Sequence, residues 1–293
     1  MASRTGGVIH DIGYRPYEGR RLSEGSIAWS LFRRGYLEAF GIGRSARAKI
    51  LPMTMAVLML IPALVIVSVI VLVSLAEGFL NYSTYINIFS VGIVIFVAGQ
   101  APVLFTRDLR SGAISLYLAR PLPTWAFALI RCASLAAAIF TISALPLLLM
   151  FIGAVSNEAD FTDQASDFFP AVLSVLILSV ILASVTGLIS ALTTRRGFAV
   201  GAILISLWVS SAFVTAVQAI ADFNRMDGLS QFVGLLSPFS LADGIQSGLL
   251  GGTASFLGSP EGIGMILLYV VSSIVLVLGS LLLLIRSYRR KAK

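Results

Sequence analysis

Few side chains in this sequence have the chemistry of a catalyst or a metal ligand. The only histidine, His10, lies in a charged N-terminal segment, and the only cysteine, Cys132, lies in an apolar stretch. They therefore form neither a catalytic pair nor a metal cluster. No GxxxxGK[ST] motif, which would bind the phosphates of a nucleotide, occurs in the chain. We expect no enzyme active site, no cofactor and no metal in this chain.

Three polar side chains inside apolar stretches are the remaining candidates. Arg131 is either an anchor that extends to the membrane surface or a functional group, and Gln100 and Gln218 either join helices or line a transport path. No Asp or Glu lies inside these stretches. Ion-coupled carriers usually place an acid there, so its absence argues against a secondary transporter.

Six apolar stretches must position these side chains. A helix needs about 20 apolar residues to cross a bilayer, and the composition, with 57% hydrophobic and 12% charged residues, is typical of a membrane protein. We predict an all-α polytopic membrane protein whose transmembrane domain covers residues 50–285. The predicted spans are residues 50–75, 88–105, 125–155, 168–192, 198–221 and 263–285.

The charges between these stretches indicate the topology. With six spans, 20 of the 21 Lys and Arg fall on the side of the two termini, and only Arg225 falls on the other side. The positive-inside rule then places both termini in the cytoplasm, including a basic tail at residues 286–293. Because these basic residues lie beside the membrane, we expect contacts with anionic lipids and not with nucleic acid.

The N-terminal segment, residues 1–49, contains one amphipathic stretch at residues 26–42. An apolar face beside a basic face predicts a helix that lies in the membrane interface, although packing against a soluble partner is an alternative, and both can hold at once. The residues that define this helix are Trp29, Phe32, Arg33, Arg34, Tyr36 and Phe40.

The connection between the second and third spans predicts a short helix at about residues 107–119. Charged residues at its start and an apolar surface at its centre suit a helix that docks onto another protein, and an ordinary solvated turn is the alternative. Its candidate contact residues are Arg107, Asp108, Arg110, Gly112, Ile114, Leu116, Tyr117, Leu118 and Arg120.

The long connection before the last span is too apolar for a free loop and too often interrupted by glycine and proline to cross a bilayer. We predict a re-entrant helical hairpin at about residues 229–257, because broken backbone at membrane depth needs protein around it.

This layout resembles that of the ABC type 2 exporter permeases. The family's second connection has an acid in a charged cluster, a glycine, a leucine-rich turn, a proline and a basic residue leading into the third span. Asp108 stands where the family usually has Glu, and Ile114 and Tyr117 interrupt the leucine turn. The matching positions are Asp108, Gly112, Leu116, Leu118, Pro121 and Arg131.

The resemblance implies a permease that works with a separate P-loop ABC ATPase subunit, which would hold ATP and Mg, and with a second permease chain. Motion of the ATPase would reach the spans through residues 107–118 and the interfacial helix, and residues 229–257 would form the external gate. The pathway would run between the two permeases. Its candidates on this analogy are Phe96, Gln100, Phe213 and Gln218.

Taken together, these features predict a transport subunit that moves a hydrophobic or amphipathic substrate, such as a drug, an antibiotic or a lipid-like molecule, out of a bacterium across its cytoplasmic membrane. The alternative is a membrane scaffold or accessory subunit that transports nothing. A membrane enzyme comes third, because no nucleophile, base or metal cluster is visible.

Overall fold

The computed structural model describes residues 23–73, 81–110, 122–156, 161–193 and 195–291. Within these ranges the chain is helical and contains no strand. The elements are α1 (Glu24–Ala39), α2 (Ala46–Val73), α3 (Tyr82–Ile88), α4 (Ser90–Arg110), α6 (Thr124–Ser156), α7 (Phe161–Leu192), α8 (Arg196–Phe223), α9 (Asp227–Val233), the 3-10 turn η1 (Gly234–Leu236), α10 (Pro238–Leu249) and α11 (Gly262–Lys291).

Five helices, α2, α6, α7, α8 and α11, are long and apolar enough to cross a membrane. A sixth span results if α3 and α4, which meet at an angle of 56°, are counted together. For the described residues this confirms an all-helical chain with five or six helices that are candidate membrane spans. The second span differs from its predicted range, because a separate helix, α3, precedes the apolar stretch. Its polar residues Ser83 and Asn87 bond to the segment around α10, which allows them to lie inside the protein.

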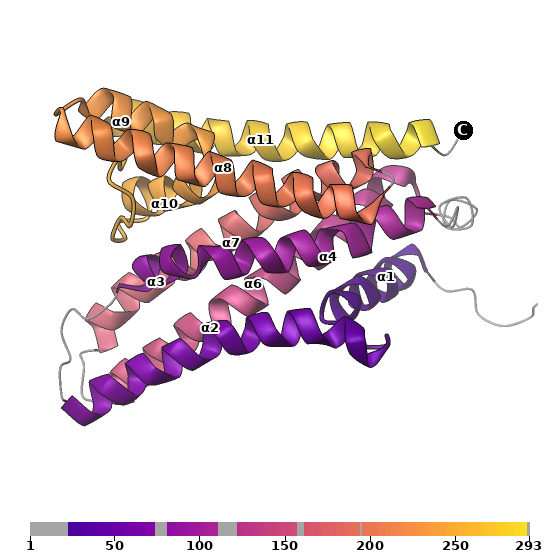
Figure 1. Cartoon of the computed structure of the whole chain (residues 1–293), viewed down its shortest axis with the longest axis horizontal. Coiled ribbons are helices and arrows are strands. Elements are labelled where there is room, and N and C mark those ends of the chain that lie inside the picture. Colours follow the sequence, from indigo (N-terminus) through magenta and orange to yellow (C-terminus); the bar gives the residue numbers. More distant parts are fainter. Residues whose placement is uncertain (1–22, 74–80, 111–121, 157–160, 194, 292–293) are drawn as a thin grey trace, which may run out of the picture.

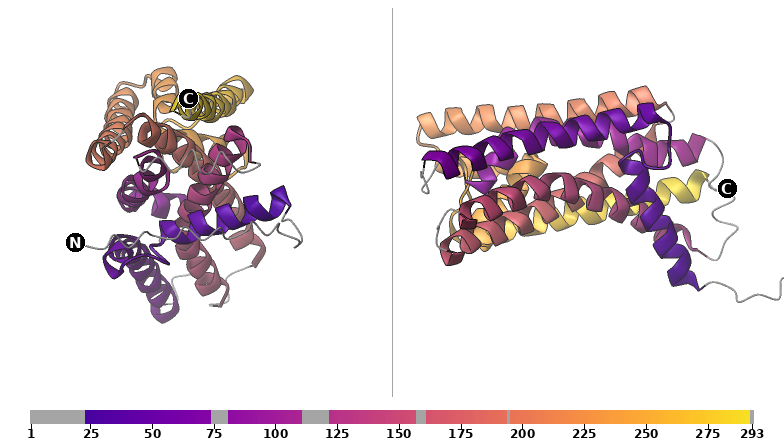
Figure 2. Two further views of the ribbon diagram at one scale, coloured as in Figure 1. Left: turned by 90° about the vertical axis from the view of Figure 1, so that its right-hand side faces the viewer. Right: turned by 90° about the horizontal axis from the view of Figure 1, so that it is seen from below.

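The long helices lie side by side, as Figure 1 shows, and the short helices occupy opposite ends of the bundle. Helix α1, the last turn of α4 and the C-terminal end of α11 lie at one end, hereafter the α1 end. Helices α3, α9 and α10 lie at the other, hereafter the α10 end (Figures 1 and 2).

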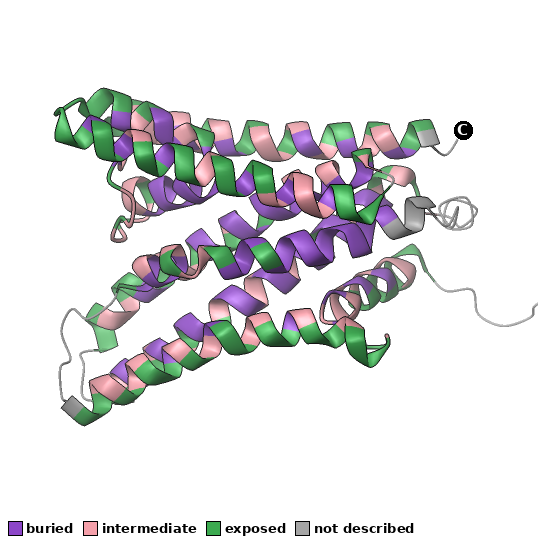
Figure 3. Cartoon of the chain, viewed as in Figure 1, coloured by how far each residue is buried: buried purple, intermediate pink, exposed green. Residues whose placement is uncertain are grey.

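The core of the bundle is centred on α7, which packs against α4, α6, α10 and α11. In the most apolar part of α7 56% of the residues are buried, whereas the same fraction is 11% in α2 and 17% in α8 and α11. Figure 3 shows this difference as buried residues between the helices and exposed ones on the outer faces of α2, α8 and α11. Apolar outer faces of this kind are typical of helices that contact lipid.

Small residues allow close contact between several helices. A Cβ atom added at Gly153 of α6 would lie 2.5 Å from Val67 Cγ1 of α2, and one at Gly187 of α7 would lie 2.9 Å from the ring of Phe105 of α4. Helices in a membrane associate largely through such van der Waals contact. Glycine at these positions therefore determines how closely α2 and α4 approach the core.

Candidate functional site

The first candidate site is the contact between α1 and α6 at the α1 end. Helix α1 begins at an N-cap serine, Ser23, which accepts a hydrogen bond from the backbone of Ser26. Its buried residues, Leu31, Gly35 and Ala39, recur every four positions and so share one face of the helix. This face packs against α6 and α4. Helix α1 thus covers residues 26–39 of the predicted range 26–42, and its buried face contacts the spans of its own chain.

An ion pair fixes this contact. Arg131 Nη1 of α6 lies 3.4 Å from Glu38 Oε2 of α1, and Glu38 Oε1 also pairs with Arg34 Nε at 3.1 Å. The Arg131 side chain is 2% exposed, and its guanidinium lies 5.5 Å from the centre of the Phe127 ring. Arg131 therefore does not extend to the surface as an anchor. A buried cation requires a paired anion, and Glu38 provides one.

Hydrogen bonds and aromatic contacts extend the attachment along α1. The Ser134 hydroxyl of α6 is shared between the carbonyl oxygen of Ile130 in its own helix, at 2.8 Å, and that of Phe32 in α1, at 3.1 Å. The hydroxyl groups of Tyr36 and Thr141 lie 3.1 Å apart. The rings of Trp29, Phe32, Tyr36 and Phe40 follow one another with centroid distances of 5.5, 6.5 and 5.2 Å. The row ends at Phe96 of α4, 6.0 Å beyond Phe40. An aromatic path therefore connects the exposed surface of α1 with the core.

The outer surface of α1 contains a hollow of about 380 Å³. Arg33 and Arg34 line it together with Leu37, Glu38 and Ile42. Of the predicted docking helix, Arg107, Asp108 and Arg110 belong to the last turn of α4, where the structure describes the backbone. The other predicted docking residues, Gly112, Ile114, Leu116, Tyr117, Leu118 and Arg120, lie outside the described residues.

The close approach of α1 to α6 at Gly35 leads to a testable expectation. A Cβ atom at Gly35 would lie 2.7 Å from Ser134 Oγ, whereas one at Gly25 in the same helix meets nothing within 4 Å. We expect Gly35→Ala to loosen α1 by about 1 to 3 kcal/mol through overpacking, and Gly25→Ala to have no such effect. Limited proteolysis within α1 measures the difference; equal cleavage of both variants would contradict the contact.

The second candidate site lies at the α10 end. The predicted re-entrant segment, residues 229–257, contains most of α9 and all of η1 and α10. The chain then forms no helix over residues 250–261, the last part of which leads into α11. Two spans hold this segment through polar contacts. Gln218 Nε2 of α8 donates to the carbonyl oxygen of Ser230 at 3.1 Å, and Tyr269 OH of α11 donates to that of Gln231 at 2.7 Å. Residues 238–246 of α10 are all buried, so this helix is part of the core.

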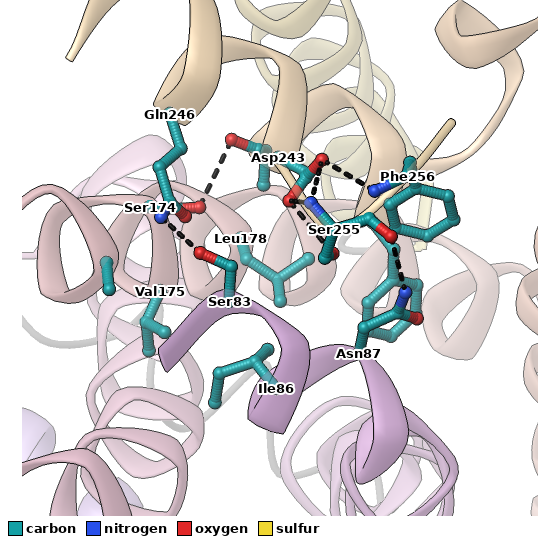
Figure 4. A pocket seen from close by; sticks show the side chains of 13 residues that line it. Ser83, Ile86, Asn87, Ser174, Val175, Leu178, Asp243, Gln246, Ser255 and Phe256 are labelled. Atoms are coloured by element: carbon teal, nitrogen blue, oxygen red, sulfur yellow. Dashed lines mark hydrogen bonds between the residues drawn. The ribbon is translucent and has the colours of Figure 1, made fainter. Parts of the chain in front are cut away.

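A polar cluster joins α10 to α3, to α7 and to the irregular segment that follows α10 (Figure 4). Asp243 of α10 accepts hydrogen bonds from the backbone N–H and the hydroxyl group of Ser255 and from the backbone N–H of Phe256. Gln246 Nε2 donates to Ser83 Oγ of α3. Ser174 Oγ of α7 donates to the carbonyl oxygen of Ala242 at 3.1 Å. A cavity of about 20 Å³ between these groups has room for one water molecule.

Asp243 is 6% exposed, and its carboxylate accepts from three donors, of which the Ser255 N–H is shared between the two oxygens. Its Oδ1 atom accepts at 3.0 and 2.9 Å, and its Oδ2 atom accepts at 3.1 and 3.2 Å. A carboxylate has about four acceptor positions. The cluster is therefore suited to holding residues 255–256 against α10.

Burial raises the pKa of Asp243 above its ordinary value of 3.8, and the hydrogen bonds from Ser255 and Phe256 offset part of this rise. A carboxyl group with a raised pKa in the folded state binds a proton more readily when folded. Its contribution to stability is therefore greatest below the ordinary pKa and falls as the pH rises through the higher folded-state value.

The direction of this pH dependence can be measured by comparing the stability of the wild type with that of Asp243→Asn, whose side chain does not titrate. We expect the thermal midpoint of the wild type minus that of Asp243→Asn to decrease as the pH is raised from about 4 to 8. Thermal unfolding in detergent at several pH values gives this difference. A difference that grows with pH would mean that the hydrogen bonds outweigh burial.

The four pathway candidates do not form one surface. Phe96, Gln100 and Gln218 are buried within the chain, whereas Phe213 is 52% exposed on α8. Gln218 joins α8 to α9, which is the helix-joining role that was one of the two interpretations of this residue. The amide oxygen of Gln100 is buried and has no hydrogen-bond partner among the described residues.

Sequence reasoning did not identify the Asp243 cluster. A signal was present, because Asp243 is the only acid between Asp227 and Glu261 and Gln246 follows three positions later on the same helical face. No protein-family model matches the chain, and no curated protein matches it in sequence.

Proposed function

We propose that this chain is the transmembrane permease subunit of an ABC exporter, and that it moves a hydrophobic or amphipathic substrate out across a bacterial cytoplasmic membrane. A separate P-loop ATPase subunit would bind ATP and Mg, and a second permease chain would complete the pathway. Both termini, and with them the α1 end, face the cytoplasm in this proposal because the basic residues gather there.

The observation that supports the proposal best is the attachment of α1. An amphipathic helix carries a basic outer hollow, and a buried ion pair fixes its inner face to α6. The last turn of α4 lies at the same end of the bundle (Figure 1). A partner that binds at this end would therefore press on two elements, of which one contacts α6 and the other continues into the core. Movement of rigid helices against a packed core is a common way of transmitting a conformational change.

Purification of the chain from its native membrane in mild detergent tests the proposal. We expect a P-loop ATPase in a stoichiometric amount by mass spectrometry, and we expect its recovery to fall at least several-fold in the double variant Asp108→Ala, Arg110→Ala. Asp222→Ala, an exposed acid at the other end, is the control and should leave recovery unchanged. A chain that is recovered without an ATPase would instead support the scaffold alternative.

A further inference from the structure

Helix α1 carries a row of three side chains on the face opposite its contact with α6. Trp29, Arg33 and Leu37 recur every four residues, so they share one face of the helix. This row starts two positions before the buried row of α1 and is therefore turned by about 200° from it. Trp29 is 65% exposed, and Arg33 is exposed as well. An aromatic, a basic and an aliphatic side chain thus point away from α6.

The orientation of α1 decides what this row faces. Figure 2 shows that α1 lies across the direction of the long helices. Its contacts on α6 run from Arg131 to Thr141, which is about 15 Å along that helix. Helix α1 therefore lies against the side of α6 and not beyond its end. The opposite face of α1 is then directed sideways, out of the bundle, where a membrane protein meets lipid.

The turn after α1 gives the depth of the hollow on this helix. A Cβ atom at Gly41 would lie 2.6 Å from the carbonyl oxygen of Ala48, so the turn is level with the start of α2. Ile42, which lines the hollow, belongs to this turn. The start of α2 has two exposed basic residues, and the helix carries no charge from Ile50 onward, about 3 Å beyond Ala48. Such a change along a span marks the border between headgroups and hydrocarbon, so the hollow opens at headgroup depth.

The charges of the hollow suit a phosphate group. Arg33 and Arg34 line it, and Glu38 is the only acid among its lining residues. Glu38 pairs with Arg34 and Arg131, and no acid in the described part of the chain lies within ion-pair distance of Arg33. A guanidinium group matches a phosphate with two parallel hydrogen bonds. Arg33 is therefore the side chain best placed to bind an anion here.

The direction and the lining of the hollow favour a lipid over an acidic protein segment. Leu37 and Ile42 form its apolar part, and Ile42 is 45% exposed. A phospholipid places a phosphate beside an alkyl chain, which is the same arrangement as Arg33 beside Leu37 and Ile42. A soluble partner would approach along the bundle axis, whereas the row on α1 is directed sideways. The exposed Trp29 is also typical of a membrane interface.

We propose that the hollow on α1 binds an anionic phospholipid of the leaflet at the α1 end, with the lipid phosphate on Arg33 and an acyl chain along Leu37 and Ile42. The lipid would hold one face of α1 while α6 holds the other. The site does not depend on the proposed ATPase. Binding of the ATPase is tested at Asp108 and Arg110 of α4 and binding of the lipid at Arg33, so either can fail alone.

Fluorescence quenching tests this site with the full-length chain in lipid nanodiscs. The chain has three tryptophans, so Trp125→Phe and Trp208→Phe leave Trp29 as the reporter, one helical turn from Arg33. Phosphatidylglycerol with brominated acyl chains is the probe, in a background of phosphatidylcholine. We expect the quenching of Trp29 to saturate at a low mole fraction of this probe. Brominated phosphatidylcholine should instead quench in proportion to its mole fraction.

Two arginine variants provide a matched comparison. Arg33→Gln should raise the mole fraction of phosphatidylglycerol at half-maximal quenching about fivefold, because one basic residue near an anionic membrane surface contributes about 1 kcal/mol. Arg196→Gln removes the same charge from an exposed position at the start of α8, at the same end, and should leave this value unchanged. An equal shift in both variants would overturn the site, because it would show attraction of the lipid by net charge alone.

Three further results would overturn the proposal. Equal quenching by the two brominated lipids would show that the hollow does not select an anionic lipid, and the reporter chain with Arg33 intact gives this result. Displacement of the probe by inorganic phosphate, beyond the effect of chloride at equal ionic strength, would indicate a site for free anions. Loss of a copurifying soluble protein from Arg33→Gln, with unchanged quenching, would indicate a protein-docking surface.

Discussion

Replacement of Asp243 by alanine should release residues 255–256 from α10 and lower the thermal midpoint by on the order of 10 °C. Three donors lose their acceptor in this variant, namely two backbone N–H groups and the Ser255 hydroxyl. Each buried donor left unsatisfied costs about 1 to 3 kcal/mol. Ser255 and Phe256 are half-buried, so we expect about 1 kcal/mol for each donor, and three such losses are still a large part of the stability of a folded protein. No basic side chain pairs with Asp243 in the described part of the chain, so no separated ion pair adds to this loss.

Thermal unfolding of the purified chain measures this effect, with Asp222→Ala as the control at an exposed position on the same end. Asp243→Asn should have an intermediate effect, because its amide keeps one acceptor oxygen and places an N–H₂ group against a backbone donor. Hydrogen exchange provides a second measurement, in which the amides of Ser255 and Phe256 should lose protection before the spans do. Equal midpoints for Asp243→Ala and Asp222→Ala would show that the cluster does not stabilise this end.

The second large effect should come from the buried pair of Glu38 and Arg131. Removal of one partner of a fully buried ion pair costs about 3 to 5 kcal/mol. Arg131 is 2% exposed, but Glu38 is 13% exposed and also pairs with Arg34, so the loss of Arg131 should cost less than the loss of Glu38. We expect Glu38→Gln and Arg131→Met each to destabilise the chain, and the double variant to cost less than their sum by about 1 to 3 kcal/mol. Arg33→Met, at an exposed position on α1, should change the stability little.

The double-mutant cycle separates this pair from the rest of the α1 contact. If the two single effects are additive, the 3.4 Å contact between Glu38 and Arg131 contributes nothing by itself. A coupling energy would instead assign to the pair a measurable part in holding α1. Recovery of the proposed ATPase subunit in the same variants then tells whether the position of α1 affects its binding.

The sequence predicted the spans well because their signal is local. A stretch of about 20 apolar residues identifies a span without knowledge of its neighbours, and α2, α6, α7, α8 and α11 all lie where such stretches occur. Helix α3 was missed for the same reason. Ser83 and Asn87 lower the hydropathy of the segment, and only their partners near α10 explain how they are accommodated.

The site contacts were harder to predict because they depend on how helices cross. The amphipathic pattern of residues 26–42 indicated α1, but nothing local indicated that Glu38 would meet Arg131, 93 positions later. The partners of Asp243 lie only 12 and 13 positions away, yet they follow an irregular segment whose path the sequence does not define. Arg131 and Asp243 could each be recognised in the sequence as a charged residue in a mostly apolar segment. The residues that they contact could not be recognised.

The bonds of α3 also determine an order of events during synthesis. Ser83 bonds to Gln246, 163 positions later, and Asn87 bonds to the carbonyl oxygen of Ser255, 168 positions later. At a translation rate of about 5 to 20 residues per second, the ribosome needs about 10 to 30 seconds to make the missing partners. During that time the polar face of α3 must be satisfied by water, lipid headgroups or the insertion machinery. The second span therefore reaches its final form only after most of the chain has been made.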